Sequence, residues 1–163
     1  MGTNYKLRNV DWNEIRILSK NILSQIKTEN LEIDTLVTIF RGGSVLSLIL
    51  SANIENLKTA CIHVTRSLSN DANAEFGSSI YKGITNFSEI EGKNILLTED
   101  IIDSGLTIDN VIQELKKYNP KNIYIATFYN FNKGKYKNVI SGERMSDYCW
   151  IVFQWEEKLN ERD

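Results

Sequence analysis

Residues 94–108 read Asn-Ile-Leu-Leu-Thr-Glu-Asp-Ile-Ile-Asp-Ser-Gly-Leu-Thr-Ile, an apolar run followed directly by acidic residues and a glycine turn. The apolar residues 95–97 predict a buried strand, and the chain then turns through Gly105 into a helix expected to begin near Thr107. An apolar core does not accept unpaired carboxylates. Their position directly after a buried strand therefore indicates a ligand site at the end of that strand.

The turn and the acidic pair favour different parts of one ligand. Free N–H groups and the dipole at a helix N-terminus bind anions, and Ser104 and Thr107 add hydroxyl donors. Gly105 lets the main chain approach a phosphate oxygen closely. Glu99 and Asp100 are instead suited to sugar hydroxyls, or to a hard cation that bridges sugar and phosphate groups. A sugar phosphate satisfies both halves.

Helix and strand patterns alternate along the chain, which is typical of a parallel α/β sheet. Asp11 and Glu14 have capping-box spacing, and with an apolar stripe they predict a first helix over 11–28. The polar stretch 66–79 is interpreted as a long loop of the kind that closes over a site. The remaining pattern predicts strands at 35–40, 59–65, 94–99 and 123–129 and helices at 44–52 and 107–118.

Length and composition favour one compact catalytic domain over residues 1–163. The chain is 42% hydrophobic with a net charge of -2, which argues against nucleic acid as a partner, because recognition of a phosphate backbone needs a basic surface. Cys61 and Cys149 lack metal-ligand spacing and are expected to be buried free thiols. No apolar run approaches the roughly 20 residues of a membrane helix. No membrane partner is expected, and the expected location is the cytoplasm.

Three motifs resemble those of the type I phosphoribosyltransferases. Residues 95–107 match the phosphoribosyl diphosphate (PRPP) signature, in which an apolar strand runs into two acids, two apolar residues and Asp-(Ser/Thr)-Gly-x-Thr. Residues 38–43, Thr-Ile-Phe-Arg-Gly-Gly, resemble the pyrophosphate loop of the purine branch. Residues 150–156, Trp-Ile-Val-Phe-Gln-Trp-Glu, resemble the tail of the xanthine, guanine and hypoxanthine phosphoribosyltransferases.

The resemblance implies an α/β fold in which a parallel twisted sheet, with a Rossmann-like core, is flanked by helices and carries a small hood and a flexible loop. It implies transfer of 5-phosphoribose from PRPP to a nucleobase of the purine class, with release of pyrophosphate. Mg²⁺ is the implied cofactor, PRPP and the base are the implied small-molecule partners, and relatives commonly form homo-oligomers.

The resemblance also assigns roles to individual residues. Asp103 would exchange a proton with the base, while Glu99 and Asp100 would hold the ribose hydroxyls and the metal, directly or through water. The implied contacts are Ser104, Gly105, Leu106 and Thr107 for the 5′-phosphate, Arg41 and Gly42 for the pyrophosphate, and Trp150, Ile151 and Phe131 for the base. A cis peptide is expected before Gly42. In the family the flexible loop closes over the reacting centre, where Arg66, Ser67 and Lys82 could reach the pyrophosphate.

Base recognition is where the sequence departs from the resembled pattern. Relatives that use 6-oxopurines end the strand after the signature helix in a lysine that donates to O6, and here that position falls on Phe131. Lys133 could substitute only if the loop bulges, whereas Asn130 or Asn132 could offer both a donor and an acceptor. The base therefore stays open. A PRPP- or nucleotide-binding regulatory protein without base transfer is the alternative hypothesis.

Each motif by itself also has a simpler explanation. Acids after a strand often cap the next helix, and Arg41 alone could be a surface residue in a turn. Trp150 and Trp155 would alone be core aromatics, and we expect one ring to be buried and the other to lie near the base. His63, the only histidine, is expected in the core or in a pocket wall rather than as a catalytic base.

Overall fold

The computed structural model describes residues 6–66, 79–132 and 134–157. Ser67, Lys133 and most of the stretch predicted as a flexible loop lie outside the described residues. The elements are β1 (Leu7–Val10), α1 (Trp12–Thr28), β2 (Thr35–Phe40), α2 (Ser44–Ser51), β3 (Lys58–Arg66), β4 (Ser79–Thr85), the 3₁₀ helix η1 (Phe87–Glu89), β5 (Asn94–Ile102), α3 (Leu106–Lys116), β6 (Asn122–Asn130), β7 (Val139–Arg144), β8 (Trp150–Phe153) and the 3₁₀ helix η2 (Gln154–Glu156).

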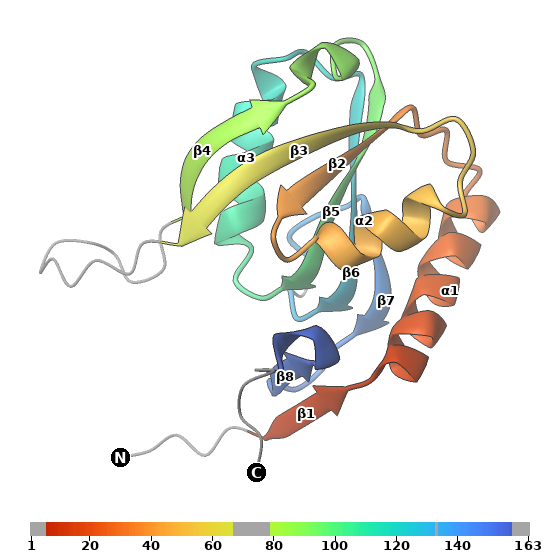
Figure 1. Ribbon diagram of the computed structural model, residues 1–163, viewed down its shortest axis with the longest axis vertical. Coiled ribbons are helices and arrows are strands. Elements are labelled where there is room, and N and C mark those ends of the chain that lie inside the picture. Colours follow the sequence, from red (N-terminus) through yellow and green to blue (C-terminus); the bar gives the residue numbers. More distant parts are fainter. Residues whose placement is uncertain (1–5, 67–78, 133, 158–163) are drawn as a thin grey trace, which may run out of the picture.

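Six strands form the main sheet, in the order β4-β3-β2-β5-β6-β7. Every neighbouring pair is parallel except β3 and β4, which are antiparallel. Helices α1 and α2 cover one face of this sheet and α3 covers the other, as Figure 1 shows. The predicted α/β fold with a mostly parallel sheet flanked by helices is confirmed.

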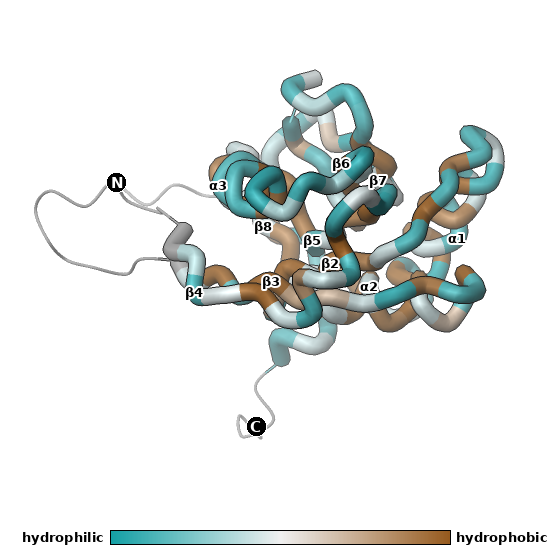
Figure 2. Tube along the Cα trace, turned by 90° about the horizontal axis from the view of Figure 1, so that it is seen from above, coloured by the Kyte–Doolittle hydropathy of each residue, from teal (hydrophilic) through white to brown (hydrophobic). Residues whose placement is uncertain are grey.

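The apolar core lies in two layers, one on each face of the sheet. Figure 2 shows the apolar segments concentrated in the central strands, between α3 and α2. Buried side chains of the α1 and α2 layer include Ile15, Leu18, Ile22, Leu46, Leu50, Leu36, Leu96 and Phe128. Those of the α3 layer include Val37, Ile39, Ile62, Ile95, Leu97, Ile108, Val111 and Leu115. Adjacent residues of β5 alternate between the two layers because successive side chains of a strand point to opposite faces.

The first helix begins and ends within one residue of the prediction. Asp11 caps it, and the Asp11 Oδ1 accepts a hydrogen bond from the Glu14 amide at 2.8 Å. Its apolar residues recur at helical spacing and are buried, so that face packs on the sheet while the other faces solvent. None of the described helices is long and apolar enough to span a membrane.

Strands β1, β4 and β7 were not predicted. Strand β4 begins at Ser79, so the predicted polar loop is shorter than expected. Strand β1 has four residues and pairs only with β8, which lies at the other end of the chain. Strand β7 reads Val-Ile-Ser-Gly-Glu-Arg, and its polar second half shows no apolar run or alternation that would predict a strand. Short strands that find their partners far along the chain leave little periodicity to detect.

Strands β1 and β8 form a separate small parallel sheet, which corresponds to the predicted hood. Figure 1 shows this hood facing the ends of β5, β6 and β7. The carboxyl ends of parallel strands are where α/β proteins bind ligands. The hood therefore adds a wall beyond the ends of the strands.

A charged cluster centred on Arg8 of β1 ties the hood to the main sheet. The Arg8 guanidinium donates to both Glu143 carboxylate oxygens, at 2.9 and 2.7 Å, and also to Glu14 at 2.5 Å. The Tyr129 hydroxyl donates to the same Glu14 oxygen at 2.6 Å, and the guanidinium lies 4.9 Å from the Tyr129 ring centroid. These bonds connect β1 with α1, β6 and β7. The bidentate Arg8–Glu143 pair fixes both distance and orientation.

The two cysteines differ in burial. Both are free, and Cys149 is buried as expected. Cys61 is only partly buried, so the expectation of two buried thiols is half wrong. Even so, burial raises the pKa of the Cys61 thiol.

The phenol of Tyr129 predicts a loss of stability at alkaline pH. Its pKa is raised, first because the ring is buried and then because the hydroxyl donates to Glu14. In the unfolded chain a tyrosine ionises near pH 10, whereas the folded chain holds the proton to higher pH. The stability that the neutral phenol contributes is therefore complete below about pH 10 and is lost as the pH rises towards the folded-state pKa.

We expect the free energy of unfolding to fall above about pH 10, with up to about 1.4 kcal/mol per pH unit coming from Tyr129. The variant Tyr129→Phe should be less stable at neutral pH because it lacks the hydrogen bond, but its stability should fall less steeply with pH. Urea unfolding between about pH 9 and about pH 11 measures both slopes. Identical slopes would contradict this account of Tyr129.

Candidate active site

The site begins where the pairing of β2 with β5 ends. These neighbouring parallel strands are in register from Thr35 opposite Ile95 to Thr38 opposite Thr98. The residues that follow in each strand therefore meet at the same edge of the sheet. This brings the Arg-Gly-Gly segment after β2 against the two acids of β5, although about 60 residues separate them in the chain.

Each glycine of the Arg-Gly-Gly segment is in close contact with β5. A Cβ placed on Gly42 would collide with the Glu99 carboxylate and lie 2.8 Å from the Asp100 Oδ1. A Cβ on Gly43 would collide with the Thr98 carbonyl group of β5. The glycines are therefore needed for close approach. The Phe40–Arg41 peptide is cis, so the expected cis bond lies one residue earlier than predicted.

Three hydroxyl groups join the two strands beneath this contact. The Ser47 Oγ of α2 lies 2.6 Å from the Thr38 Oγ1 of β2 and 2.5 Å from the Thr98 Oγ1 of β5. Each hydroxyl can both donate and accept, so the three form a continuous chain. Helix α2 is thereby attached to both strands directly behind the glycine pair.

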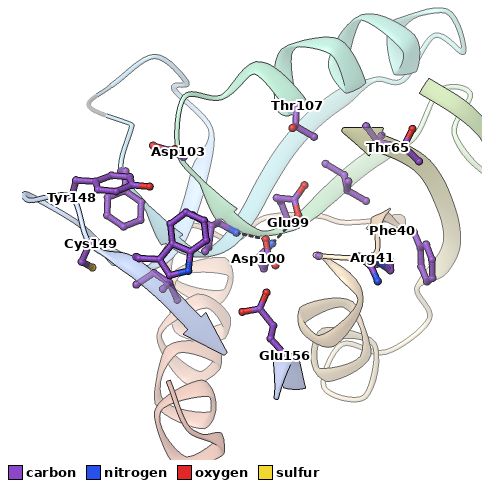
Figure 3. Close-up of a pocket in the computed structure, with 17 residues that line it drawn as sticks. Phe40, Arg41, Thr65, Glu99, Asp100, Asp103, Thr107, Tyr148, Cys149 and Glu156 are labelled. Carbon is purple, nitrogen blue, oxygen red and sulfur yellow. Dashed lines mark hydrogen bonds between the residues drawn. The ribbon is translucent and has the colours of Figure 1, made fainter. Parts of the chain in front are cut away.

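A cavity of about 590 Å³ opens at this edge of the sheet. Figure 3 shows Glu99 and Asp100 between Arg41 on one side and Asp103 on the other. The lining residues are Ile39, Phe40, Arg41, Gly42, Val64, Thr65, Glu99, Asp100, Ile101, Asp103, Thr107, Phe131, Tyr148, Cys149, Trp150, Ile151 and Glu156. They come from β2, β3, β5, α3, β8 and η2 and from the segments that follow β2, β5, β6 and β7.

Most of the residues predicted for the site line this one cavity. They are Arg41, Gly42, Glu99, Asp100, Asp103, Thr107, Phe131, Trp150 and Ile151. The other three residues predicted for the phosphate, Ser104, Gly105 and Leu106, lie in the turn between Asp103 and Thr107 but not in the lining. Any contact that these three residues make with a ligand would come from the turn beside the cavity and not from its wall.

The turn has the geometry of a helix N-terminus. Gly105 is the N-cap of α3 and has φ of 82° and ψ of 2°, a left-handed conformation that favours glycine. Its carbonyl accepts the Asp109 amide at 2.9 Å, which is the first helical hydrogen bond. The Leu106 amide lies 3.4 Å from the Ser104 Oγ. Helix α3 begins at Leu106, one residue before the prediction, and ends at Lys116, two residues before it.

Aromatic rings form the wall of the cavity where the base was expected. The Phe131 and Tyr148 rings lie 5.5 Å apart, and Trp150 is 53% exposed in the lining. Trp155 instead packs against the core and stacks on Phe153 at 4.3 Å. Trp155 thus packs on the core but is only partly buried rather than buried as expected, while Trp150 lines the cavity, where its contact with a base stays a prediction.

The other candidates for base contact are engaged elsewhere. Asn130 is buried, and its Oδ1 accepts the Asn132 amide at 2.9 Å. The Asn132 Nδ2 donates to the Ser104 carbonyl at 3.4 Å, so Asn132 lies beside the turn that starts α3. Neither asparagine lines the cavity. Among the described residues of this segment, Phe131 is the one that does.

His63 and Lys82 lie outside the cavity lining. His63 is exposed on β3 and its ring lies 5.1 Å from that of Phe40. The expectation of a core or pocket-wall histidine is wrong, because its neighbour Ile62 takes the buried position and alternate residues of a strand face opposite ways. Lys82 is exposed on β4 and does not line the cavity either.

Glu156 and Tyr148 are cavity residues that the sequence did not assign to the site. Figure 3 shows the Glu156 carboxylate directed towards Asp100. The Phe153 amide donates to the Glu156 Oε2 at 2.9 Å. The acid that ends the tail motif was visible in the sequence. Its placement opposite Asp100 depends on how β8 and η2 are packed.

The donor set fits Mg²⁺ that is shared with a substrate. Among the residues that the structure describes, no group of three or more His, Cys, Asp and Glu side chains is arranged to hold a metal ion. Glu99 and Asp100 nevertheless present carboxylates side by side against Gly42. Protein sites for Mg²⁺ commonly supply one or two carboxylates and leave the other positions to water and substrate phosphates.

The model of the phosphoribosyl transferase domain family matches residues 10–162, so the chain belongs to this family. It is 25% identical over 123 residues to the transcriptional regulator GfcR of Methanocaldococcus jannaschii, a match covering 69% of this chain and 56% of that protein. It is 40% identical over 45 residues to the hypoxanthine-guanine phosphoribosyltransferase of Homo sapiens, covering 28% of this chain and 21% of that protein. The matches thus span little more than half of the first relative and about a fifth of the second.

Solved structures show the same fold. A purine phosphoribosyltransferase from Pyrococcus horikoshii Ot3 has a TM-score of 0.74 at 20% identity, covering 97% of this chain and 99% of that one. A hypothetical protein from Neisseria gonorrhoeae with bound ppGpp has a TM-score of 0.79 at 18% identity, covering 98% and 93%. The xanthine-guanine-hypoxanthine phosphoribosyltransferase of Helicobacter pylori has a TM-score of 0.66 at 22% identity, covering 94% of each chain. The predicted family and fold are confirmed.

The two glycines should respond differently to alanine. In Gly43→Ala the new methyl group meets the Thr98 carbonyl, which is backbone of a central strand and cannot turn aside. We expect a loss of about 1–3 kcal/mol in the free energy of unfolding, the usual cost of overpacking. In Gly42→Ala the methyl group meets the ends of the Glu99 and Asp100 side chains, which can rotate.

Gly42→Ala should therefore lose less stability but displace both carboxylates. Urea unfolding of the two variants compares their stabilities, and binding of PRPP in the presence of Mg²⁺ compares their sites. Each variant is the control for the other because the same methyl group is added at adjacent positions. A larger loss of stability in Gly42→Ala than in Gly43→Ala would contradict this packing.

Proposed function

We propose that this protein transfers the 5-phosphoribosyl group of PRPP to a nucleobase of the purine class and releases pyrophosphate. The observation that carries the proposal is the meeting of three segments at one cavity. These are Arg41 and Gly42 after β2, Glu99 and Asp100 in β5, and the turn that starts α3. A ligand with phosphate at both ends of a ribose matches this order of cation, carboxylates and helix N-terminus.

The reaction replaces the C1–oxygen bond to pyrophosphate by a C1–nitrogen bond to the base. Positive charge develops on the ribose ring and negative charge on the leaving group. The Glu99 and Asp100 carboxylates would hold the ribose hydroxyls and stabilise the positive ring. The Arg41 guanidinium and the amides near Gly42 would stabilise the departing pyrophosphate. Asp103, on the base side, would accept the proton that the attacking nitrogen loses.

Magnesium would be held at the same carboxylates. When bound with the substrate, Mg²⁺ would neutralise part of the charge on the pyrophosphate. Glu99 and Asp100 would provide its protein contacts, directly or through water, as the pair lies against Gly42. Glu156 faces this position from the tail of the chain and adds a carboxylate nearby.

The base would enter between the aromatic wall and Asp103. Trp150, Phe131 and Ile151 line that part of the cavity, and offset stacking on a ring favours a flat heterocycle. The purine class is supported by the tail motif and by similarity to hypoxanthine-guanine phosphoribosyltransferase.

A second candidate function is a PRPP- or nucleotide-binding regulatory protein that lacks base transfer. Phe131 supports it, because an aromatic ring packed near Tyr148 stands where an O6 donor was expected. The similarity to the regulator GfcR and the fold shared with a protein that has bound ppGpp also support it. The retained Asp103, Glu99, Asp100 and Arg41 support the enzyme.

We also propose that residues 1–163 act as one domain, that the protein is a homo-oligomer and that it works in the cytoplasm. The two-layered core on a single main sheet supports one domain. Family resemblance supports the oligomer and the location. Light scattering of the purified protein measures the oligomeric state.

The deciding experiment is a screen of purine and pyrimidine bases for Mg²⁺-dependent release of pyrophosphate from PRPP. Release with a purine, and none with pyrimidines or after metal removal, is the expected result. Tight binding of PRPP with no release for any base would instead support the regulator. Failure to bind PRPP would contradict both functions.

Asp103→Asn tests the proposed proton acceptor. The amide keeps the size of the carboxylate but cannot take the proton, so we expect turnover to fall by about 10²–10⁴-fold. Binding of PRPP, measured by calorimetry, should stay close to that of the wild type because other residues hold the phosphates. Turnover equal to that of the wild type would refute this role for Asp103.

A further inference from the structure

The connection from β6 to β7 contacts the turn that starts α3 through Tyr136. The Tyr136 hydroxyl lies 2.8 Å from the Gly105 carbonyl oxygen and 2.9 Å from the Asp109 Oδ1. Both oxygens are acceptors, so the single phenolic proton bonds to one or is shared by the two. Tyr136 is thus attached to the turn itself and to the first turn of the helix.

The Tyr136 ring also covers Gly105. A Cβ placed on Gly105 would collide with the Tyr136 hydroxyl and lie 3.1 Å from two carbon atoms of the ring. Gly105 thus meets two demands, because its φ of 82° and its contact with the ring both exclude a side chain. The Tyr136 ring can occupy this position because residue 105 has no side chain.

Two further residues hold Tyr136 in place. Lys135 forms an ion pair with Asp109, and its ammonium also lies 5.4 Å from the centroid of the Tyr136 ring. The pKa of Tyr136 is raised, first by burial and then by its hydrogen bond to Asp109. The phenol therefore keeps its proton and remains a donor.

Because the peptide unit is planar, the hydrogen bond from Tyr136 to the Gly105 carbonyl also affects the direction of the next amide, that of Leu106. The Gly105 carbonyl and the Leu106 N–H belong to one planar trans peptide, in which the two groups point in opposite directions. A bond that fixes the oxygen therefore fixes the direction of the N–H. The Leu106 N–H is among the donors that the proposed function gives to the 5′-phosphate.

Asn132 acts in the same way on the preceding peptide. Its Nδ2 donates to the Ser104 carbonyl at 3.4 Å, and its Oδ1 accepts the Lys135 amide at 3.1 Å, which orients the side chain. The Ser104 carbonyl shares a peptide plane with the Gly105 N–H. One connection therefore holds two successive carbonyls of the turn.

We propose that Tyr136 is a positioning residue of the phosphate site, which aims the Leu106 amide by holding the Gly105 carbonyl. Asp109 and Lys135 fix Tyr136, and Asn132 supports the peptide before it. This inference rests on the proposed function because it needs a phosphate at the turn. It assigns the orientation of the amides in that subsite to a segment outside the recognised motifs.

The test uses two probes that occupy opposite ends of the site. Ribose 5-phosphate carries the group proposed for the turn, and inorganic pyrophosphate carries the group proposed for Arg41 and Gly42. Calorimetric titration of each probe, with Mg²⁺ present, is compared between the wild type and Tyr136→Phe. The variant keeps the ring on Gly105 and removes the hydroxyl group, and with it the hydrogen bond to the turn.

We expect Tyr136→Phe to bind ribose 5-phosphate about 2- to 12-fold more weakly, as for the loss of one hydrogen bond, and to bind pyrophosphate as the wild type does. In the reaction, KM for PRPP should rise by a similar factor while kcat changes less. Tyr118→Phe is the matched control, since Tyr118 lies beyond the other end of α3 against Phe87. It should bind both probes normally.

Two outcomes would overturn the inference and leave the proposed function standing. One is unchanged affinity of Tyr136→Phe for ribose 5-phosphate. The other is an equal loss for both probes, which would mean general damage to the fold. A wild type that binds neither probe would instead remove the proposed function, and this inference with it.

Discussion

The site depends on the close approach of the Arg-Gly-Gly segment to the end of β5. Parallel pairing of β2 and β5 places the two segments at one edge, and Gly42 and Gly43 let the backbones meet without side chains between them. The hydroxyl chain through Ser47 attaches α2 to both strands behind this contact. A wider spacing would separate the cation of Arg41 from the carboxylates of β5, and a ligand could not touch both.

The cavity has an unusual balance of charge for a site that is proposed to take phosphates. Its lining holds the carboxylates of Glu99, Asp100, Asp103 and Glu156, and among the residues that the structure describes Arg41 is the one lysine or arginine there. Phosphates next to carboxylates repel each other unless other groups intervene. In the proposed function, amides at the start of α3 and a divalent cation between carboxylates and pyrophosphate would provide that separation. The charge of the lining therefore supports the proposed metal dependence separately from the family resemblance.

Two structures outside the motifs hold the parts of the site together. The cluster of Arg8, Glu14, Tyr129 and Glu143 joins the hood to the main sheet, and the hood carries Trp150 and Ile151. The connection after β6 holds the turn that starts α3 through Tyr136 and begins at Phe131 in the aromatic wall. The elements that carry the residues proposed for base, ribose and phosphate are thus linked to one another by direct contacts within the protein.

The sequence by itself determined the local features, because they depend on periodicity and on nearby residues. The helix over 11–28 and the turn at Gly105 agree with the structure, and the strand that carries Glu99 and Asp100 lies where predicted but continues to Ile102, three residues beyond its predicted end. Only the tertiary structure decided what meets across long separations. The pairing of β1 with β8, the exposure of His63, the position of Glu156 opposite Asp100 and the contact of Tyr136 with Gly105 follow from sheet order and packing. Such contacts join residues that are far apart in the sequence, and the residues next to either one do not indicate which partner it will meet.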